Sequence, residues 1–360
     1  MKKIVLCFVL SISLISYSQN ETTLYVGTYT DGESEGIYKI PFNETTGNFG
    51  NLQVVAKTTN PSYLAYSPNK KYMYTVGEIN NFNNETSGFV SAYKVKEDGS
   101  LQLLNTVSSK GAHPCHISID STGEKAVVSN YTGGTVALFS INIDGSLSEA
   151  NQVFNHNTTT ETSHAHSAQF YKDRLFVADL GRNAVFEYKN TANTYELVTP
   201  SIVPFENNSG PRHFALTKNG DFMYIINEYA NTITSASKKN DIFKLIGSTS
   251  TLDSTHKAES FSADIHLSKN EEFLYGSNRG ENSIAVFKRN LSTGNIHKIQ
   301  TSNVQGNWPR NFTLSPNGKF LLVANQKSEN ISVFKVHKNS GKLFFLQSIN
   351  VPTPVYLLFK

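Results

Sequence analysis

The chain has 360 residues and a formal net charge of +3, because 32 Lys and Arg residues stand against 29 Asp and Glu residues. That length allows a large core, while the mild charge, spread without any basic block, excludes a nucleic-acid-binding protein. Charged residues make up only 17% of the chain, which has 17 Tyr and 23 Phe, so the composition favours strands over helices.

The beginning of the chain has the pattern of an export signal. A short basic stretch, MKK, precedes the apolar run IVLCFVLSISLIS, and small residues follow that run. An uncleaved membrane anchor is the alternative, but the run falls short of the ~20 apolar residues that span a bilayer. We therefore predict a signal peptide over residues 1–19 and an exported protein, periplasmic or secreted, without membrane contact after cleavage.

Cleavage leaves a single cysteine, Cys115, so no intramolecular disulfide can form and stability must come from packing. Cys115 lies in HPCHI between two histidines, which makes a catalytic thiol conceivable. A small, partly buried residue at a strand start is the favoured interpretation.

The middle of the chain consists of six repeats of about fifty residues. Each repeat has an apolar run, a polar turn, a second apolar run that ends in a polar residue, a third run and a weaker fourth. Turns such as SPNKK, TKNGD and SPNGK are typical of hairpins, with Asn or Gly at the position of positive φ. The repeats begin at Pro61, His113, His164, Pro211, Ser262 and Pro309.

The two ends of the chain supply a seventh repeat in two pieces. Residues 353–359 resemble a first strand, and the second, third and fourth strands are expected at 23–30, 36–42 and 46–55. We therefore predict that residues 20–360 form one all-β domain, a seven-bladed β-propeller of four-stranded antiparallel blades. Pairing of the C-terminal strand with the N-terminal strands closes the ring and removes exposed sheet edges, and we expect a monomer.

Polar residues recur where the first strand of each blade begins and the second ends. The first strands of a propeller line its channel and the second strands run antiparallel to them, so both positions lie at one mouth of the channel. A concavity of this kind is the expected place for a binding site. The residues predicted to gather there are Glu78, His113, His116, Asn130, His164, His166, Asp179, Arg212, His213, Asn227, Glu228, Asp264, His266, Asn278, Arg279, Arg310, Asn311, Asn325 and Gln326.

Some of these residues have simpler interpretations. Four asparagines recur at one repeat position and are predicted to close the turn into the third strand; they are Asn130, Asn227, Asn278 and Asn325. For His113 and His116, hydrogen bonds within a local turn are the alternative to a role in the site. Arg212 and Glu228 are sixteen residues apart, the length of one hairpin, and are predicted to meet at a solvated rim. Several arginines facing one channel repel each other unless an anion or carboxylate joins them.

At these residues the chain resembles the family of seven-bladed lactonases, which includes bacterial 6-phosphogluconolactonases and fungal carboxy-cis,cis-muconate cyclases. The resemblance covers nearly the whole mature chain in order, and its stretches include HPCHISID, SHAHSAQF, GPRHFALTKNGDFMYIINE, SADIHLSKNEEFLYGSNRG and PRNFTLSPNGKFLLVANQ. It implies catalytic roles for His164 or His166, Arg212, Glu228 and Arg279. The neighbouring residues that we assign to substrate binding are His113, His116, His213 and Arg310.

The resemblance implies hydrolysis of a sugar lactone, such as 6-phosphogluconolactone, to the open-chain acid. A histidine near its ordinary pKa suits a general base that later acts as acid, and arginines suit an oxyanion, phosphate or carboxylate. Export argues against a phosphorylated substrate, since such sugar intermediates are cytosolic. No metal-ligand spacing such as HExxH occurs, so we expect neither metal nor cofactor. The alternatives are a cycloisomerase or lyase, or a non-catalytic propeller that binds a ligand at the mouth.

Overall fold

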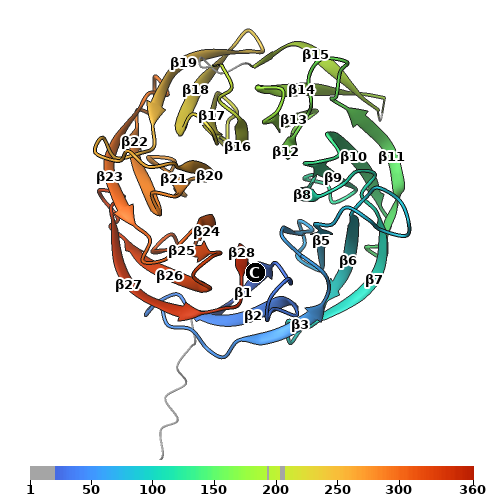
Figure 1. The fold of residues 1–360 in the computed structure, drawn as a ribbon, viewed down its shortest axis with the longest axis horizontal. Helices are drawn as coiled ribbons and strands as arrows, with labels where there is room; N and C mark the ends of the chain where they lie inside the picture. The colour runs from blue at the N-terminus through green and yellow to red at the C-terminus, as the bar shows by residue number, and fades with distance from the viewer. Residues whose placement is uncertain (1–20, 193, 203–206) are drawn as a thin grey trace, which may run out of the picture.

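The computed structural model describes residues 21–192, 194–202 and 207–360, and these form seven four-stranded antiparallel sheets around a central axis (Figure 1). The predicted seven-bladed β-propeller is thereby confirmed. The segment predicted as a signal peptide, residues 1–19, lies outside the described residues. Within the described part of the chain, no helix is long and apolar enough to cross a membrane.

All blades share one strand order from the axis outward. The innermost strands are β4 (Leu64–Tyr66), β8 (Pro114–Ile119), β12 (Ala165–Tyr171), β16 (Pro211–Leu216), β20 (Phe261–Leu267), β24 (Pro309–Leu314) and β28 (Pro354–Phe359). The second strands are β1 (Glu21–Thr28), β5 (Tyr72–Gly77), β9 (Lys125–Asn130), β13 (Arg174–Asp179), β17 (Phe222–Asn227), β21 (Phe273–Arg279) and β25 (Phe320–Asn325). The third strands are β2 (Gly36–Asn43), β6 (Phe89–Val95), β10 (Thr135–Ile141), β14 (Ala184–Thr191), β18 (Thr232–Lys239), β22 (Ser283–Arg289) and β26 (Asn330–Val336). The outermost strands are β3 (Gln53–Lys57), β7 (Leu101–Ser108), β11 (Leu147–Asn155), β15 (Thr194–Ile202), β19 (Ile242–Ser250), β23 (Ile296–Asn303) and β27 (Leu343–Asn350).

One blade is built from both ends of the chain, which confirms the predicted closure. β28 pairs antiparallel with β1, with Leu24 opposite Phe359, and β1 leads on to β2 and β3. The fourth strand of this blade, β3, was predicted over residues 46–55 but begins only at Gln53. The reason is a tight turn, in which Gly47 donates its N–H to the carbonyl of Asn43 and adopts a φ of +81° that favours glycine.

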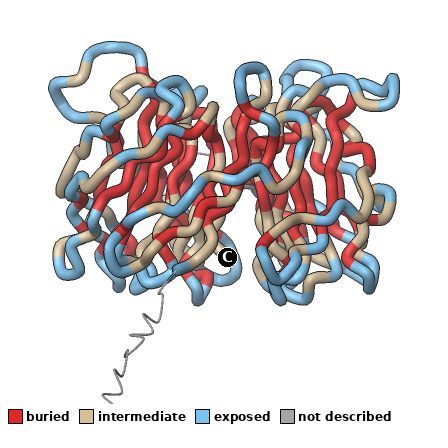
Figure 2. The backbone as a smooth tube through the Cα atoms, turned by 90° about the horizontal axis from the view of Figure 1, so that it is seen from below, coloured by how far each residue is buried: buried red, intermediate tan, exposed pale blue. Residues whose placement is uncertain are grey.

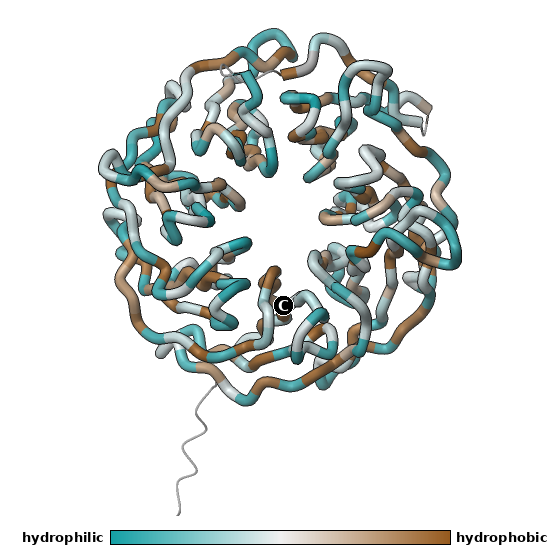
Figure 3. Tube along the Cα trace, in the orientation of Figure 1, coloured by the Kyte–Doolittle hydropathy of each residue, from teal (hydrophilic) through white to brown (hydrophobic). Residues whose placement is uncertain are grey.

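The hydrophobic core lies between neighbouring blades, and seven clusters of buried residues each join one blade to the next. Both faces of each middle strand are therefore covered, which explains continuous apolar runs such as FLLVAN in β25. Buried strands stand between exposed loops at the two rims (Figure 2), and hydrophobic residues lie within the blades (Figure 3).

Hydrogen bonds from second-strand tyrosines add a polar link between blades. In four blades the buried hydroxyl donates to a glycine carbonyl in the turn between the third and fourth strands of the next blade, which satisfies these four hydroxyls. The pairs, with donor–acceptor distances, are Tyr25–Gly99 at 2.7 Å, Tyr74–Gly145 at 3.1 Å, Tyr224–Gly294 at 2.9 Å and Tyr275–Gly341 at 3.0 Å.

Leu357 tests whether β28 seals the ring. It is 2% exposed in the cluster that joins the last blade to the closing blade. Leu357→Ala is expected to lower the free energy of unfolding by about 2–5 kcal/mol, because it leaves a cavity in that cluster. The control is Phe344→Ala on the outermost strand β27, at a side chain 56% exposed, which is expected to change stability by no more than ~0.5 kcal/mol. Equal urea midpoints for the two variants would contradict the sealing role.

Candidate active site

An extra residue in the innermost strand determines which side chains line the mouth of the channel. In several blades the register between first and second strands shifts by one residue near the start of the first strand. Such a bulge breaks the alternation of side chains, so that two consecutive residues line the channel. The extra residues are Cys115 in β8, His166 in β12, Arg212 in β16, Arg310 in β24 and Val355 in β28.

The bulged residues and their neighbours line a small cavity on the axis. The cavity has a volume of about 10 Å³, enough for about one water molecule. The lining consists of Ser62, Tyr63, Cys115, His166, Arg212, His213, Arg310, Asn311, Val355 and Tyr356.

Four of these residues were not predicted from the sequence: Ser62, Tyr63, Val355 and Tyr356. The rings of Tyr63 and Tyr356 lie 3.9 Å apart. The sequence does contain a signal for them, because the tripeptides PSY and PVY stand at the same position of the repeat as PCH and PRH. Comparison column by column identifies them, whereas a search for charged residues does not.

Glu228 is shared by two arginines at the mouth. Its Oε2 lies 2.9 Å from Arg212 Nε and 2.9 Å from Arg279 Nη2, so the predicted meeting of Arg212 and Glu228 is confirmed. Burial by itself would raise the pKa of Glu228, but the Arg279 and Arg212 guanidiniums outweigh it and hold the pKa below its ordinary value. Burial lowers the pKa of Arg279 to about 10.

The prediction that Arg212 lies at a solvated rim is wrong. Its side chain is 2% exposed, and its Nη1 donates to the carbonyl of Ala263 at 2.6 Å. The bulge directs Arg212 inward, and its partner Glu228 is 13% exposed. Arg212 is therefore a buried partner of the more accessible Glu228.

A second arginine–carboxylate pair faces the mouth. Arg310 Nη2 lies 3.7 Å from Glu78 Oε1, and the Arg310 guanidinium lies 5.3 Å from the centre of the Tyr29 ring. The mouth therefore holds three guanidiniums and two carboxylates. Carboxylates of the chain itself reduce the repulsion among the arginines, and one positive charge remains in excess.

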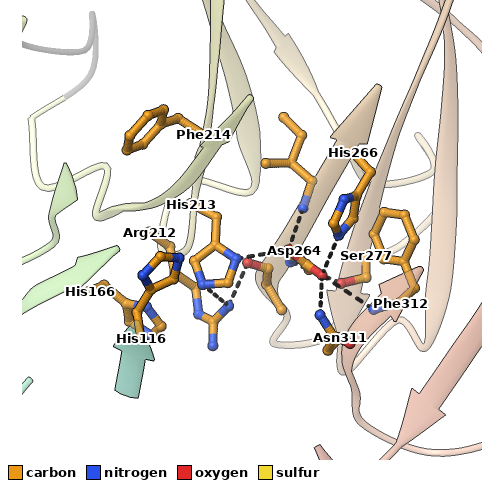
Figure 4. Close-up of polar contacts among 12 residues, drawn as sticks. His116, His166, Arg212, His213, Phe214, Asp264, His266, Ser277, Asn311 and Phe312 are labelled. Atoms are coloured by element: carbon orange, nitrogen blue, oxygen red, sulfur yellow. Dashed lines mark hydrogen bonds and ion pairs between the residues drawn. The ribbon is translucent and has the colours of Figure 1, made fainter. Parts of the chain in front are cut away.

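Three imidazoles lie together beside Arg212 (Figure 4). The ring centre of His213 is 5.1 Å from that of His166 and 5.8 Å from that of His116. Burial, together with the nearby positive charges, holds the pKa values of His116 and His166 well below their ordinary range and lowers that of His213 to about 4. All three are therefore neutral at neutral pH and have a nitrogen lone pair.

Two of the predicted site histidines, His113 and His164, lie apart from the group formed by His116, His166 and His213. His164 stacks on Tyr131, with ring centres 4.6 Å apart, so His166 is the histidine of the H-x-H stretch that reaches the cavity. His113 stands at a turn with a φ of +52°, and its Nδ1 lies 2.8 Å from Thr132 Oγ1. The structure therefore separates His113 and His164 from His116, His166 and His213.

The residues at the ends of the second strands close turns, as predicted for the asparagines. Asn227 Nδ2, for example, donates to Thr232 and Thr234. Asp179 occupies the same repeat position and accepts hydrogen bonds from the Ser163 hydroxyl and the His164 N–H, so its carboxylate has a structural role there.

Cys115 is a buried packing residue. Its sulfur contacts backbone oxygens, the nearest that of His166 at 3.3 Å, and burial raises the pKa of the thiol. A thiol held neutral in this way is a poor nucleophile, and the favoured interpretation of Cys115 is confirmed.

Comparison with known proteins agrees with this geometry. Residues 23–359 match the family described as "Lactonase, 7-bladed beta-propeller". The chain is 34% identical to a 6-phosphogluconolactonase of Formosa agariphila, over 80% of this chain and 85% of that protein. It is 31% identical to a 6-phosphogluconolactonase of Bacillus subtilis, over 80% and 83%. The solved structure of a periplasmic gluconolactonase of Pseudomonas aeruginosa superposes with a TM-score of 0.88 at 31% identity, covering 94% of this chain and 99% of that one.

Removal of the Glu228 charge is expected to destabilise the fold. Glu228→Gln leaves Arg212 buried without a carboxylate, which is expected to lower the free energy of unfolding by about 3–5 kcal/mol. The folded state lowers the pKa of Glu228, so this contribution is fully present above the ordinary pKa of 4.5 and is lost as pH falls through the folded value. Glu78→Gln, at the longer ion pair, is the control and is expected to have a smaller effect. Equal stability of wild type and Glu228→Gln at pH 7 would contradict the buried pair.

Proposed function

The chain belongs to the family of seven-bladed β-propeller lactonases, and from this premise we propose that its channel mouth hydrolyses a sugar lactone to the open-chain hydroxy acid. The observation that carries the proposal is the sharing of Glu228 between Arg212 and Arg279, next to imidazoles that are neutral at neutral pH. Guanidiniums and neutral imidazoles are the groups that water attack on an ester carbonyl requires.

The reaction makes three demands on the site. The attacking water must lose a proton, the carbonyl oxygen must be stabilised as it becomes an oxyanion, and the leaving ring oxygen must gain a proton. A neutral imidazole serves the first and third demands in turn; the resemblance assigns that role to His164 or His166, and of these two His166 lines the cavity. Arg279 and Arg310, at the mouth, are placed to bind the oxyanion. Glu228 holds Arg279 in position, with Arg212 buried behind it.

The charge balance favours an unphosphorylated substrate. Three guanidiniums and two carboxylates leave one excess positive charge, which matches a single oxyanion or the carboxylate of the product. A phosphate group adds nearly two further negative charges at neutral pH. We therefore propose an aldonolactone without phosphate, which agrees with the predicted signal peptide and with the similarity to the periplasmic gluconolactonase of Pseudomonas aeruginosa. Export to the periplasm or the medium and a monomeric state stay predictions.

A panel of lactones tests the proposal. The mature protein is expected to release acid, measured in a pH-stat, from gluconolactone faster than from 6-phosphogluconolactone. Arg279→Lys is expected to lower turnover about 10²- to 10³-fold, because the lysine lacks the planar fork of donors.

The control for Arg279→Lys is Arg289→Lys, at an equally buried arginine on β22 that donates to Tyr224 at 2.7 Å. The folded control variant is expected to retain wild-type turnover. Absence of acid release with every lactone would instead favour the cycloisomerase or the non-catalytic propeller.

Turnover is expected to survive exhaustive treatment with EDTA. In residues 21–192, 194–202 and 207–360, no three His, Cys, Asp or Glu side chains are grouped so that they would hold a metal ion. The carboxylates of the mouth are engaged by arginines. Activity that is lost on chelation and restored by one divalent cation would contradict this prediction.

A further inference from the structure

We propose that His213, held by Asp264, is the imidazole that takes the proton from the attacking water, and that Asp264 is its positioning residue. This inference rests on the proposed function and deepens it. The resemblance gives this role to His164 or His166, whereas the hydrogen bonds around the three imidazoles favour His213.

The two neighbours of the His213 ring define its tautomer. Nδ1 lies 2.7 Å from Asp264 Oδ1, and Nε2 lies 3.4 Å from Arg212 Nη1. An ionised carboxylate only accepts hydrogen bonds and a guanidinium only donates them. The ring proton is therefore on Nδ1, and the lone pair is on Nε2. The contact with Arg212 is long, and His213 lines the axial cavity, so in the proposed reaction a bound water takes the place of Arg212 at that lone pair.

Asp264 is fixed in place and in its ionised form (Figure 4). Its Oδ1 also accepts the N–H of Ile265, while Oδ2 accepts from His266, Asn311 and the N–H of Phe312. Burial alone would raise the pKa of Asp264, but the His266 charge and the hydrogen bond from His213 lower it well below its ordinary value. The carboxylate is therefore ready to stabilise an imidazolium at His213.

Neither of the other two imidazoles has such a partner. His116 Nδ1 accepts a long 3.4 Å hydrogen bond from the backbone N–H of Ala168. His166 Nδ1 is buried, and no described residue forms a hydrogen bond with it. Protonation of either ring would place a charge beside Arg212 without a bonded carboxylate, which is costly in a buried site. His166 is thus better suited to contact substrate as a neutral ring.

The proton balance of the reaction is complete with His213 alone. His213 Nε2 takes a proton from water as the water oxygen bonds to the carbonyl carbon, and the carbonyl electron pair moves to oxygen. When the oxyanion collapses, the bond from carbon to ring oxygen breaks, and that oxygen takes the proton from Nε2. The net reaction adds one water to the lactone, and the neutral imidazole is restored.

The charge on His266 provides a remote influence on His213. Burial would lower the pKa of His266, but Asp264 outweighs it and raises the pKa above its ordinary value. The His266 side chain is 40% exposed, and its positive charge contributes to the lowered pKa of His213. The titratable and charged groups around His213 are Arg212, Asp264, His266, His116, His166 and Tyr63.

Matched variants distinguish the two histidines. His213→Asn keeps a donor for Asp264 and lacks Nε2, and it is expected to lower kcat about 10²- to 10⁴-fold with little change in KM. His166→Asn is expected to act mainly on KM. His266→Gln is expected to move the acid limb of kcat/KM to higher pH, because removal of the His266 charge raises the pKa of His213. A His213→Asn enzyme within about threefold of wild-type kcat, or a kcat loss confined to His166→Asn, would overturn the proposal.

One measurement needs no active variant. In ¹⁵N-histidine-labelled wild-type protein, the His213 signals, assigned with His213→Asn, are expected to show the proton on Nδ1. A proton on Nε2 would overturn the proposal even if Asp264→Asn failed to fold. If Asp264→Asn folds, kcat is expected to fall about 10⁴-fold, as when the aspartate of a Ser–His–Asp triad is replaced by asparagine.

The two hypotheses fail in different ways. A wild-type protein that hydrolyses no lactone removes the proposed function and this inference together. A wild-type enzyme that hydrolyses lactones while His213→Asn remains active removes only the inference, and leaves His166 as the base.

Discussion

The pairing of β28 with β1 is the constraint on which the rest of the molecule depends. It places both ends of the chain in one blade, and the buried residues on either side of that blade join it to its neighbours. Only a closed ring brings first strands from all blades to one axis. The cavity, with lining residues from Ser62 to Tyr356, is a product of that closure rather than of any local segment.

Within the ring, the bulges decide which side chains meet. Each extra residue turns a side chain toward the axis that a regular strand would direct elsewhere. The inward turn of Arg212 would be unfavourable without a partner, because burial of a guanidinium removes its hydration. Glu228 offsets that cost and, through its contact with Arg279, also holds a second buried arginine at the mouth. Structural stability and the proposed substrate binding therefore depend on the same carboxylate.

The charged residues around the cavity also determine the protonation states of its histidines. Burial, together with the positive charges around the cavity, lowers the pKa values of these imidazoles and keeps them neutral, so each has a nitrogen lone pair. Asp264 distinguishes His213 from the other two imidazoles. One of its carboxylate oxygens forms a hydrogen bond with His213, and the other forms one with His266. A buried carboxylate with this many donors stays ionised and keeps its neighbours oriented.

Repeat spacing and hairpin length were enough to predict the number of blades, the split blade and the meeting of Arg212 with Glu228. The repeat position also predicted the turn-closing asparagines. Three features could not be predicted in this way: the burial of Arg212, the position of His166 rather than His164 at the cavity, and the contacts of Asp264 with both His213 and His266. The reason is physical: a bulge changes which side of a strand faces the axis, and contacts between blades depend on ring closure, so neither is contained in the periodicity of one repeat.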